Sequence, residues 1–308
     1  MTSTETPIRI ATRGSALALW QAHHVADLIC AADAECRVEI VEISTEGDRL
    51  TDVPLAVIGG KGVFVKEVQS AVLDGRADVA VHSAKDLPAV TPAGLVIAAV
   101  PERADARDVL VGCRLADLRP GAVVATGSPR RRSQLAGLRP DLRFEELRGN
   151  IDTRLTKASQ FDAIVMAAAA LDRLGRRPAV VDHLPVEVMV PQVGQGALAV
   201  ECRQDDRRLV ALLSGLDHPR TRLTLEAERS FLTALGGDCD LPAGAHAVLV
   251  GPGPELPEIE LPEVELTGVL AASRDGAMSR VVERGADAES LGATVAERLL
   301  GAVGGSAR

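Results

Sequence analysis

The chain has few aromatic residues: Phe and Trp together make up 2% of its 308 residues, and Tyr is absent. Stacking of bases on aromatic side chains is the usual way to hold single-stranded nucleic acid, so that function is disfavoured. A formal net charge of −9 also disfavours nucleic acid or an anionic membrane as the main partner. With 46% hydrophobic and 25% charged residues, the composition is that of an ordinary globular protein whose core is built from aliphatic side chains.

Motifs for metals, nucleotides and membranes are missing as well. The five cysteines are odd in number and form no CxxC, which disfavours a disulfide framework or a zinc knuckle. The sequence contains no HExxH and no GxxxxGK[ST], and no GxGxxG follows a strand in the first third of the chain. We therefore expect no metal and no bound nucleotide. No apolar run approaches the roughly 20 residues that span a bilayer, and the N-terminus lacks a signal-peptide pattern. We therefore expect a cytoplasmic protein.

Strand and helix patterns alternate in the first third of the chain. Residues 8–12, 38–45 and 79–83 are strand candidates, and a helix is expected after Ser15, a good N-cap residue. A second helix pattern ends at Gly75. This order predicts a parallel sheet with right-handed crossovers.

Further βα units follow from about residue 105, and they predict a second sheet. Residues 190–203 combine a turn-rich start with an apolar strand, which indicates a crossing between domains. The Pro- and Glu-rich segment 251–268 is interpreted as a loop or hairpin edge that lies outside the core.

Polar and basic residues recur where the predicted strands end, which is where open parallel sheets bind ligands. Residues 126–157 hold eight basic and four acidic residues, a local charge of +4 in an acidic chain. Arginine suits bidentate binding of carboxylate or phosphate, so an anionic ligand is indicated, and a solvated basic face is the alternative. The residues at these turns are Arg13, Ser15, Ser83, Lys85, Asp86, Thr126, Ser128, Arg130 and Arg148.

Anion binding alone does not explain the presence of Asp86 and Cys239. A lone carboxylate among cations should stay ionised, and it suits a cationic intermediate or a departing ammonium group. The alternative is a capping Asp before the turn at Pro88. Cys239 lies in a Gly-rich turn and should be accessible, unlike Cys202 inside a strand. Its two acidic neighbours disfavour the negatively charged thiolate, so Cys239 suits a permanent covalent attachment point better than a reactive nucleophile. His82 is interpreted as a structural hydrogen-bonding residue.

These pieces together resemble one family, hydroxymethylbilane synthase, also called porphobilinogen deaminase. The resemblance runs from about residue 8 to about residue 246. The final sixty residues match it only loosely. The matching motifs are "IATRGSALALWQA", "GGKGVFVKE", "VHSAKDLP", "GSPRRRSQL", "LRGNIDTRL", "VGQGALAVECR" and the C-x-x-P of "GGDCDLPAG".

The resemblance implies a transferase that joins porphobilinogen units head to tail into a linear tetrapyrrole and releases ammonia at each addition. It implies a dipyrromethane cofactor bound through a thioether to Cys239, and Asp86 as the catalytic residue. Lys61 and Phe64 match a mobile segment near the cleft, and Gln195 falls in the crossing segment. The positions that match groups binding the acetate and propionate side chains are Arg13, Ser15, Ser83, Lys85, Thr126, Ser128, Arg130, Arg131, Arg148, Arg154 and Arg173.

The expected fold is α/β with three domains. The first two should resemble the lobes of a periplasmic binding protein, and the third should be a small α/β domain that carries the cofactor cysteine. The expected domains are residues 1–101 plus 197–215, residues 105–191, and residues 219–308. We expect a monomer that takes a small-molecule substrate.

Two residues depart from the family pattern: Asp238 replaces a glycine that is common before the cysteine, and Val57 replaces a frequent lysine. One rival is a non-catalytic, two-lobed anion-binding protein, which explains the arginines but leaves Asp86 and Cys239 without a role. Another rival is a phosphate-ester enzyme that requires a metal.

Overall fold

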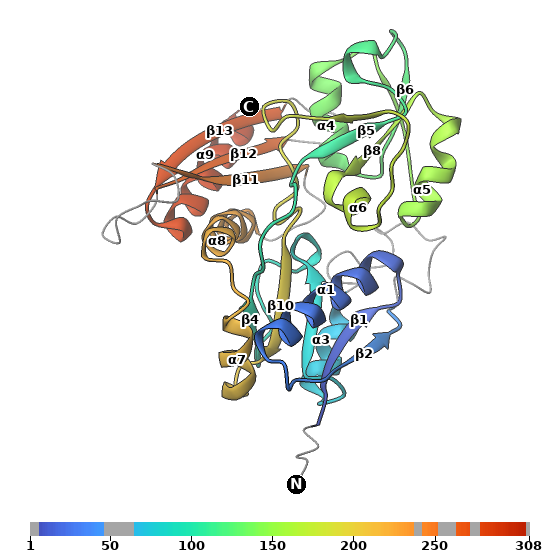
Figure 1. Cartoon of the computed structure of the whole chain (residues 1–308). Helices are drawn as coiled ribbons and strands as arrows, with labels where there is room; N and C mark the ends of the chain where they lie inside the picture. The colour runs from blue at the N-terminus through green and yellow to red at the C-terminus, as the bar shows by residue number, and fades with distance from the viewer. Residues whose placement is uncertain (1–5, 46–64, 237–241, 252–262, 272–277, 306–308) are drawn as a thin grey trace. The chain divides into compact units, whose positions relative to one another are not determined.

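The computed structural model describes residues 6–45, 65–236, 242–251, 263–271 and 278–305 (Figure 1). The chain divides into two compact units. Unit 1 comprises Met1–Ala104 and Ala197–Arg222, and unit 2 comprises Asp105–Gly196 and Leu223–Arg308.

Unit 1 is built on a five-stranded sheet in the order β2-β1-β3-β10-β4. Strand β1 runs parallel to β2 and β3, as the alternating pattern predicted. The residues Ala22, Val25 and Ile29 share one face of α1 and are fully buried in the core beside the sheet. The elements are β1 (Ile8–Arg13), α1 (Ala16–Ala32), β2 (Val38–Ile43), α3 (Lys66–Leu73), β3 (Val79–Ser83), β4 (Leu95–Ala99), β10 (Leu198–Arg203) and α7 (Arg207–Ser214).

The parallel sheet predicted from the first third of the chain is confirmed for β1, β2 and β3, but the complete sheet of unit 1 is mixed. Strand β10 lies between β3 and β4 and runs antiparallel to both. It comes from the crossing segment predicted at residues 190–203, which returns to the first sheet from a distant part of the chain. Local pattern cannot give the direction of such a strand, because a buried strand is apolar in either orientation.

Unit 2 contains a second five-stranded sheet, in the order β7-β6-β8-β5-β9. Strand β6 is parallel to β7 and β8, whereas β5 is antiparallel to β8 and β9. This sheet is mixed as well. Its elements are β5 (Asp108–Val111), β6 (Val123–Ala125), α4 (Pro129–Leu138), β7 (Arg143–Glu145), α5 (Ile151–Lys157), β8 (Ala163–Ala167), α6 (Ala168–Arg173) and β9 (Val181–His183).

The last part of unit 2 is a three-stranded antiparallel sheet, β11-β12-β13. Its central strand corrects the interpretation of segment 251–268, because residues 263–268 belong to β12. Val264 and Leu266 are fully buried there, since their alternation with glutamates matches a strand with one face in the core. The remaining elements are α8 (Pro219–Ala234), β11 (Ala243–Val250), β12 (Glu263–Ala271), β13 (Met278–Gly285) and α9 (Ala288–Gly305).

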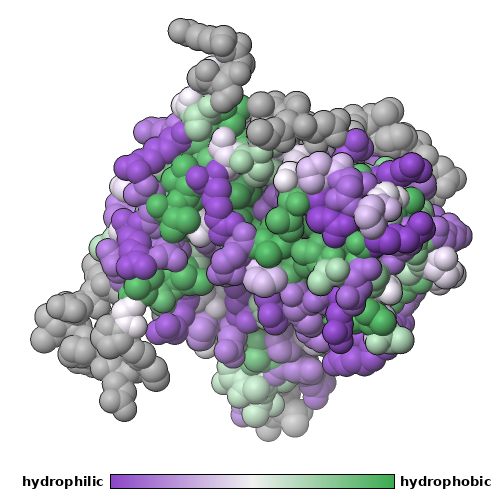
Figure 2. All heavy atoms as spheres, turned by 90° about the horizontal axis from the view of Figure 1, so that it is seen from above, coloured by the Kyte–Doolittle hydropathy of each residue, from purple (hydrophilic) through white to green (hydrophobic). Residues whose placement is uncertain are grey.

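The α/β class is confirmed, and the described residues form three sheets. The three-domain boundaries stay a prediction. In the part of the chain that the structure describes, no helix is both long and apolar enough to cross a membrane. The face drawn in Figure 2 is mostly hydrophilic and is interrupted by smaller apolar areas.

Candidate active site

The carboxyl ends of β1 and β3 form a small pocket in unit 1, with a volume of about 60 Å³. These strands are parallel neighbours, with Ile10 opposite Val79, so the residues that follow them emerge at the same edge of the sheet. The pocket brings together four residues predicted from the sequence. They are Arg13, Ser15, Ser83 and Asp86.

Helix α1 is fixed to this edge by its first turn. Ser15 is its N-cap, and the Ser15 Oγ accepts a hydrogen bond of 3.3 Å from the backbone N–H of Ala18. Farther along the helix, Gln21 Nε2 donates to Ser83 Oγ at 2.7 Å. The hydroxyl groups of the two predicted serines are therefore held by α1.

Asp86 ends a single 3-10 turn, Ala84–Asp86, that directly follows β3. Its side chain is exposed, and Lys85 beside it is partly buried. The capping alternative finds no support here: among the described residues, no backbone N–H donates to the Asp86 carboxylate. The carboxylate borders the pocket instead, where it is able to accept or donate a proton.

A buried carboxylate behind the pocket was missed by the sequence reasoning. Glu201 on β10 is fully buried, and its Oε2 accepts a hydrogen bond of 2.9 Å from Gln69 Nε2. His82, which lines the pocket, places its Nε2 3.2 Å from the same oxygen. Although these two atoms are close, His82 Nε2 has no hydrogen-bond partner among the described residues, so the hydrogen-bonding role of His82 stays a prediction. A glutamate inside the apolar run Leu198–Cys202 was the available signal, because such a residue needs a buried partner.

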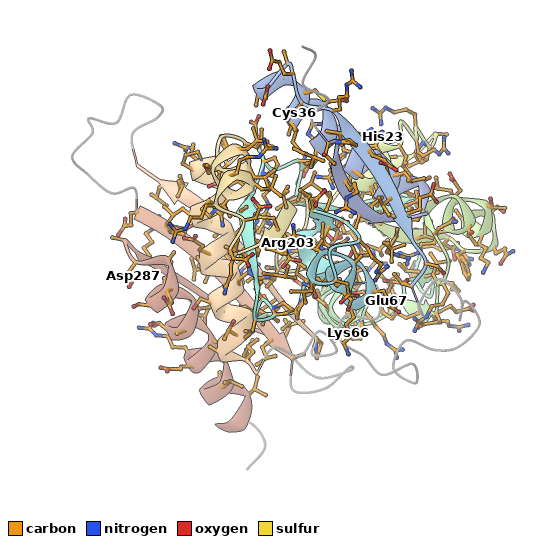
Figure 3. The ribbon with its side chains drawn as sticks, turned by 90° about the horizontal axis from the view of Figure 1, so that it is seen from below. His23, Cys36, Lys66, Glu67, Arg203 and Asp287 are labelled. Atoms are coloured by element: carbon orange, nitrogen blue, oxygen red, sulfur yellow. The ribbon has the colours of Figure 1, made fainter. Side chains whose placement is uncertain are left out.

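Helix α3 borders the same pocket through Val68. Figure 3 labels Lys66 and Glu67 at its start. The same view labels Arg203 on β10, whose Nη1 donates to the carbonyl oxygens of Val72, near the end of α3, and of Ala77, in the segment that follows α3. Helix α3 is thus fixed to β10 beneath the site. The predicted residues Lys61 and Phe64 lie outside the described residues.

The second set of predicted residues gathers in unit 2 at the start of α4. Ser128 is the N-cap of α4, and its Oγ accepts from the backbone N–H of Arg131 at 3.4 Å. The Ser128 backbone N–H donates to Thr126 Oγ1 at 3.2 Å. Ser128 and Thr126 thus stabilise the N-terminus of α4, and a helix N-terminus is a favourable place for an anion.

Arg130 and Arg131 are buried, with 4% and 7% of their surface exposed. Both guanidinium groups donate to Asp108, at 2.8 Å from Arg130 and 2.7 Å from Arg131. Gln195 Nε2 donates to the same carboxylate at 2.9 Å. The sequence reasoning did not single out Asp108, because nothing local distinguishes it from other aspartates.

Three further predicted arginines lie elsewhere in unit 2. Arg148 pairs with Glu146 at 2.7 Å and is partly exposed. Arg154 Nε donates to the carbonyl of Gly149. Arg173 at the end of α6 donates to the carbonyl of Gly196 at 2.7 Å, and burial lowers its pKa to about 10. A guanidinium with that pKa is still protonated at neutral pH.

The predicted cysteine, Cys239, lies outside the described residues, as do Asp238 and Val57. Cys202, by contrast, is fully buried in β10, and burial raises its pKa to about 11. Its thiol is therefore protonated at neutral pH and poorly suited to covalent chemistry. This agrees with the expectation that a strand cysteine is inert.

Two family models match the chain in sequence. Residues 8–211 match the model described as porphobilinogen deaminase, dipyromethane cofactor binding domain. Residues 222–301 match porphobilinogen deaminase, C-terminal domain. The chain belongs to the porphobilinogen deaminase family. This confirms the resemblance and shows that the family match extends through the final sixty residues, where the motifs alone matched loosely.

Curated relatives agree with this membership. Porphobilinogen deaminase from Brevibacillus brevis is 46% identical over 297 residues, covering 95% of this chain and 93% of that protein. The enzyme of the same name from Nitratidesulfovibrio vulgaris is 46% identical over 298 residues, covering 94% and 92%. Membership places the chain among the transferases of tetrapyrrole biosynthesis. It stands against both the non-catalytic anion-binding protein and the phosphate-ester enzyme.

Solved structures that resemble the chain include solute-binding proteins. An ancestral cationic amino acid solute binding protein is 15% identical, with a TM-score of 0.44, covering 68% of this chain and 87% of that one. The L-cystine solute receptor of Neisseria gonorrhoeae is 14% identical, with a TM-score of 0.38, covering 75% and 88%. This is the class that the first two domains were expected to resemble. With TM-scores below 0.5, the likeness carries no further weight.

Proposed function

We propose that the protein condenses four molecules of porphobilinogen head to tail into the linear tetrapyrrole hydroxymethylbilane and releases ammonia at each addition. Asp86 is the catalytic residue in this proposal. Its carboxyl group donates a proton to the departing amine, and the resulting carboxylate then stabilises the positive charge on the substrate's methylene carbon. The observation that carries the assignment is the position of Asp86 at the edge of the strand-end pocket, where no backbone N–H of the described residues donates to its carboxylate.

The residues present fit a dipyrromethane cofactor, which carries several carboxylates. Arg130 and Arg131 supply two buried guanidinium groups against the single carboxylate of Asp108, so these three side chains keep one positive charge in excess. An excess buried charge is costly, and a bound carboxylate would relieve that cost. When bound, the dipyrromethane supplies the pyrrole end from which the chain grows.

The remaining contacts are proposed from the residue types and their positions. Cys239 is the attachment point, on the strength of its C-x-x-P motif. Lys61 and Phe64 belong to a mobile segment near the cleft, and Gln195 holds the crossing segment. We also infer a monomer that works in the cytoplasm. The groups proposed to bind the acetate and propionate side chains are Arg13, Ser15, Ser83, Lys85, Thr126, Ser128, Arg130, Arg131, Arg148, Arg154 and Arg173.

Replacing Asp86 by Asn tests the catalytic assignment. The amide keeps the size of the side chain but can neither deliver a proton nor carry a negative charge. We expect turnover to fall by at least about 100-fold, which is the lower range for an acid–base group. Steady-state formation of hydroxymethylbilane measures turnover, and the intact mass of the protein reports whether the dipyrromethane is attached.

The matched control is Asp27→Asn, on the exposed side of α1 in the same unit. It removes the same charge away from the pocket and should leave turnover unchanged. Turnover of Asp86→Asn within about threefold of the parent protein, with the cofactor mass present, would remove Asp86 from the mechanism.

A further inference from the structure

Asp108 is the first residue of β5, and its side chain is completely buried. Its Oδ1 accepts from Arg131 Nε at 3.1 Å, from Arg131 Nη2 at 2.7 Å and from Gln195 Nε2 at 2.9 Å. Its Oδ2 accepts from Arg130 Nη2 at 2.8 Å. Four donors from three side chains therefore converge on one carboxylate.

Each guanidinium group is also held at a second point. Arg130 Nη1 donates to the carbonyl of Val190 at 2.5 Å, and Arg131 Nη1 donates to the carbonyl of Val165 at 3.0 Å. A planar guanidinium that is bound on two sides has a fixed orientation. Because each guanidinium has five N–H donors, these bonds leave further donors whose directions are set by the fixed plane.

Charge distinguishes this cluster from an ordinary buried ion pair. Burial by itself would raise the pKa of Asp108, but Arg130 and Arg131, with the hydrogen bond from Gln195, lower it well below the usual carboxyl value. Asp108 is thus ionised at neutral pH. Burial lowers the pKa of Arg130, although Asp108 partly opposes this. Even a balanced buried ion pair gains little net stability, because the cost of desolvating its two charges offsets their attraction. A cluster of two cations and one anion is therefore poorly suited to stability alone.

We propose that Asp108 is a positioning residue for the deaminase reaction, because it orients the Arg130 and Arg131 guanidinium groups that grip carboxylates of the pyrrole chain. This inference rests on the proposed function of these two arginines. Asp108 acts through them and makes no contact with the substrate itself. Gln195 supports it from the crossing segment and also donates to the carbonyl of Ala106.

The variant Asp108→Asn tests this role, because the amide keeps the shape but loses the charge and one acceptor atom. We expect a lower fraction of purified protein that carries the dipyrromethane mass. For the fraction that carries it, we expect KM for porphobilinogen to rise at least about tenfold, with a smaller change in kcat. Intact mass spectrometry and steady-state kinetics give the two readouts, and a thermal melt reports stability separately.

The matched control is Asp162→Asn, at the residue that directly precedes β8 of the same sheet. Like Asp108, Asp162 pairs with an arginine, Arg119, but it accepts from a backbone N–H, that of Val123 at 2.8 Å. It does not contact Arg130 or Arg131. The control should lower the melting temperature without changing the cofactor fraction or KM. If Asp108→Asn does the same, a structural role explains Asp108 and the proposal is overturned.

A double-mutant cycle with Arg131→Met separates the possible failures. If Asp108 acts through Arg131, the combined effect on KM is smaller than the product of the single effects by at least about fivefold. Multiplicative effects would show independent action and overturn the proposal. If Arg131→Met and Arg130→Met each leave the cofactor fraction and KM unchanged, the two arginines do not bind carboxylates of the pyrrole chain. That result would contradict their proposed function, and with it the role of Asp108.

A milder variant covers the case in which Asp108→Asn does not fold. Gln195→Met removes one neutral donor to Asp108 Oδ1 and leaves both ion pairs in place. We expect KM to rise about threefold or more, with the protein still folded by its melting curve. An unchanged KM in a folded Gln195→Met protein would contradict the role given to Asp108.

Discussion

Asp108 and Glu228 are buried carboxylates that each accept hydrogen bonds from several donors. Glu228 on α8 accepts from the backbone N–H of Gly194 at 2.7 Å and from that of Ala247 at 2.9 Å, and it is completely buried. Asp108 accepts from side-chain donors instead. Among the described residues, Glu201 accepts one hydrogen bond, from Gln69, and its Oε1 accepts none. A buried charge persists only when it is paired or hydrogen-bonded, so each of these residues connects segments that are distant in sequence.

The partly buried pair of Asp78 and Arg9 gives a pH-dependent prediction. Arg9 donates to Asp78 from its Nε and Nη2 atoms, at 3.0 and 2.9 Å. Burial opposes the shift, but the bonds to Arg9 lower the pKa of Asp78. A lowered carboxyl pKa stabilises the fold above the unfolded value of about 3.9, and this stabilisation is lost as pH falls through the folded value.

We therefore expect Asp78→Asn to lower the free energy of unfolding by about 1 kcal/mol at pH 7, a figure reduced for partial exposure. The difference should be smaller at pH 3 than at pH 7, because pH 3 lies below the unfolded pKa of about 3.9. Urea unfolding curves at both pH values measure it. Asp74→Asn is the control, because its pair with Arg76 is more than half exposed and 3.5 Å long. A deficit for Asp78→Asn that is equal at both pH values would contradict the assignment.

Secondary-structure elements pack closely where glycines replace larger side chains. A Cβ at Gly292 on α9 would lie 2.4 Å from the carbonyl oxygen of Ala227 and 2.6 Å from the nitrogen of Phe231, both on α8. A Cβ at Gly268 on β12 would lie 2.5 Å from Val295 Cγ1 on α9. Helix α9 is thus in close contact with both α8 and β12, and this contact excludes side chains at these two positions.

For this reason Gly292→Ala should lower the free energy of unfolding by about 2 kcal/mol or more, since backbone atoms would have to move. Gly301→Ala on the same helix has open space around its Cβ and should be neutral or stabilising by up to about 1 kcal/mol. Denaturant unfolding of both variants measures the contrast. Equal stabilities would mean that α8 and α9 do not approach each other this closely.

At the scale of the whole molecule, a bound cofactor should stabilise the fold, because only the folded state presents the arginines that bind it. The cluster of Asp108, Arg130 and Arg131 has one positive charge in excess. The carboxylates of the cofactor would offset that charge and so stabilise the folded state. Removing the attachment point removes this source of stability.

Cys239→Ser protein should therefore lack the dipyrromethane mass and melt about 4 °C or more below the parent protein. Intact mass spectrometry and differential scanning calorimetry check the two outcomes. Cys30→Ser is the control, because Cys30 is an exposed free cysteine of α1 and should change neither quantity. A Cys239→Ser protein that still carries the adduct would disprove the attachment site.

Much of the local structure could be predicted, because it depends on neighbours in sequence. The cap at Ser15, the buried face of α1 and the strand from Val79 to Ser83 follow from spacing alone. The reversed direction of β10 and the central position of β12 did not follow. Both depend on which strands meet across long separations, and a short apolar pattern is the same in either arrangement.

The sequence alone determined the family of the protein, its α/β class and the candidate residues at the strand ends, since motif order and periodicity are written along the chain. Only the tertiary structure decided that Arg130 and Arg131 share Asp108, and that Glu201 lies behind His82. The physical reason is burial: a polar group out of water must find partners, and those partners lie 22 to 119 residues away, where no local pattern can name them.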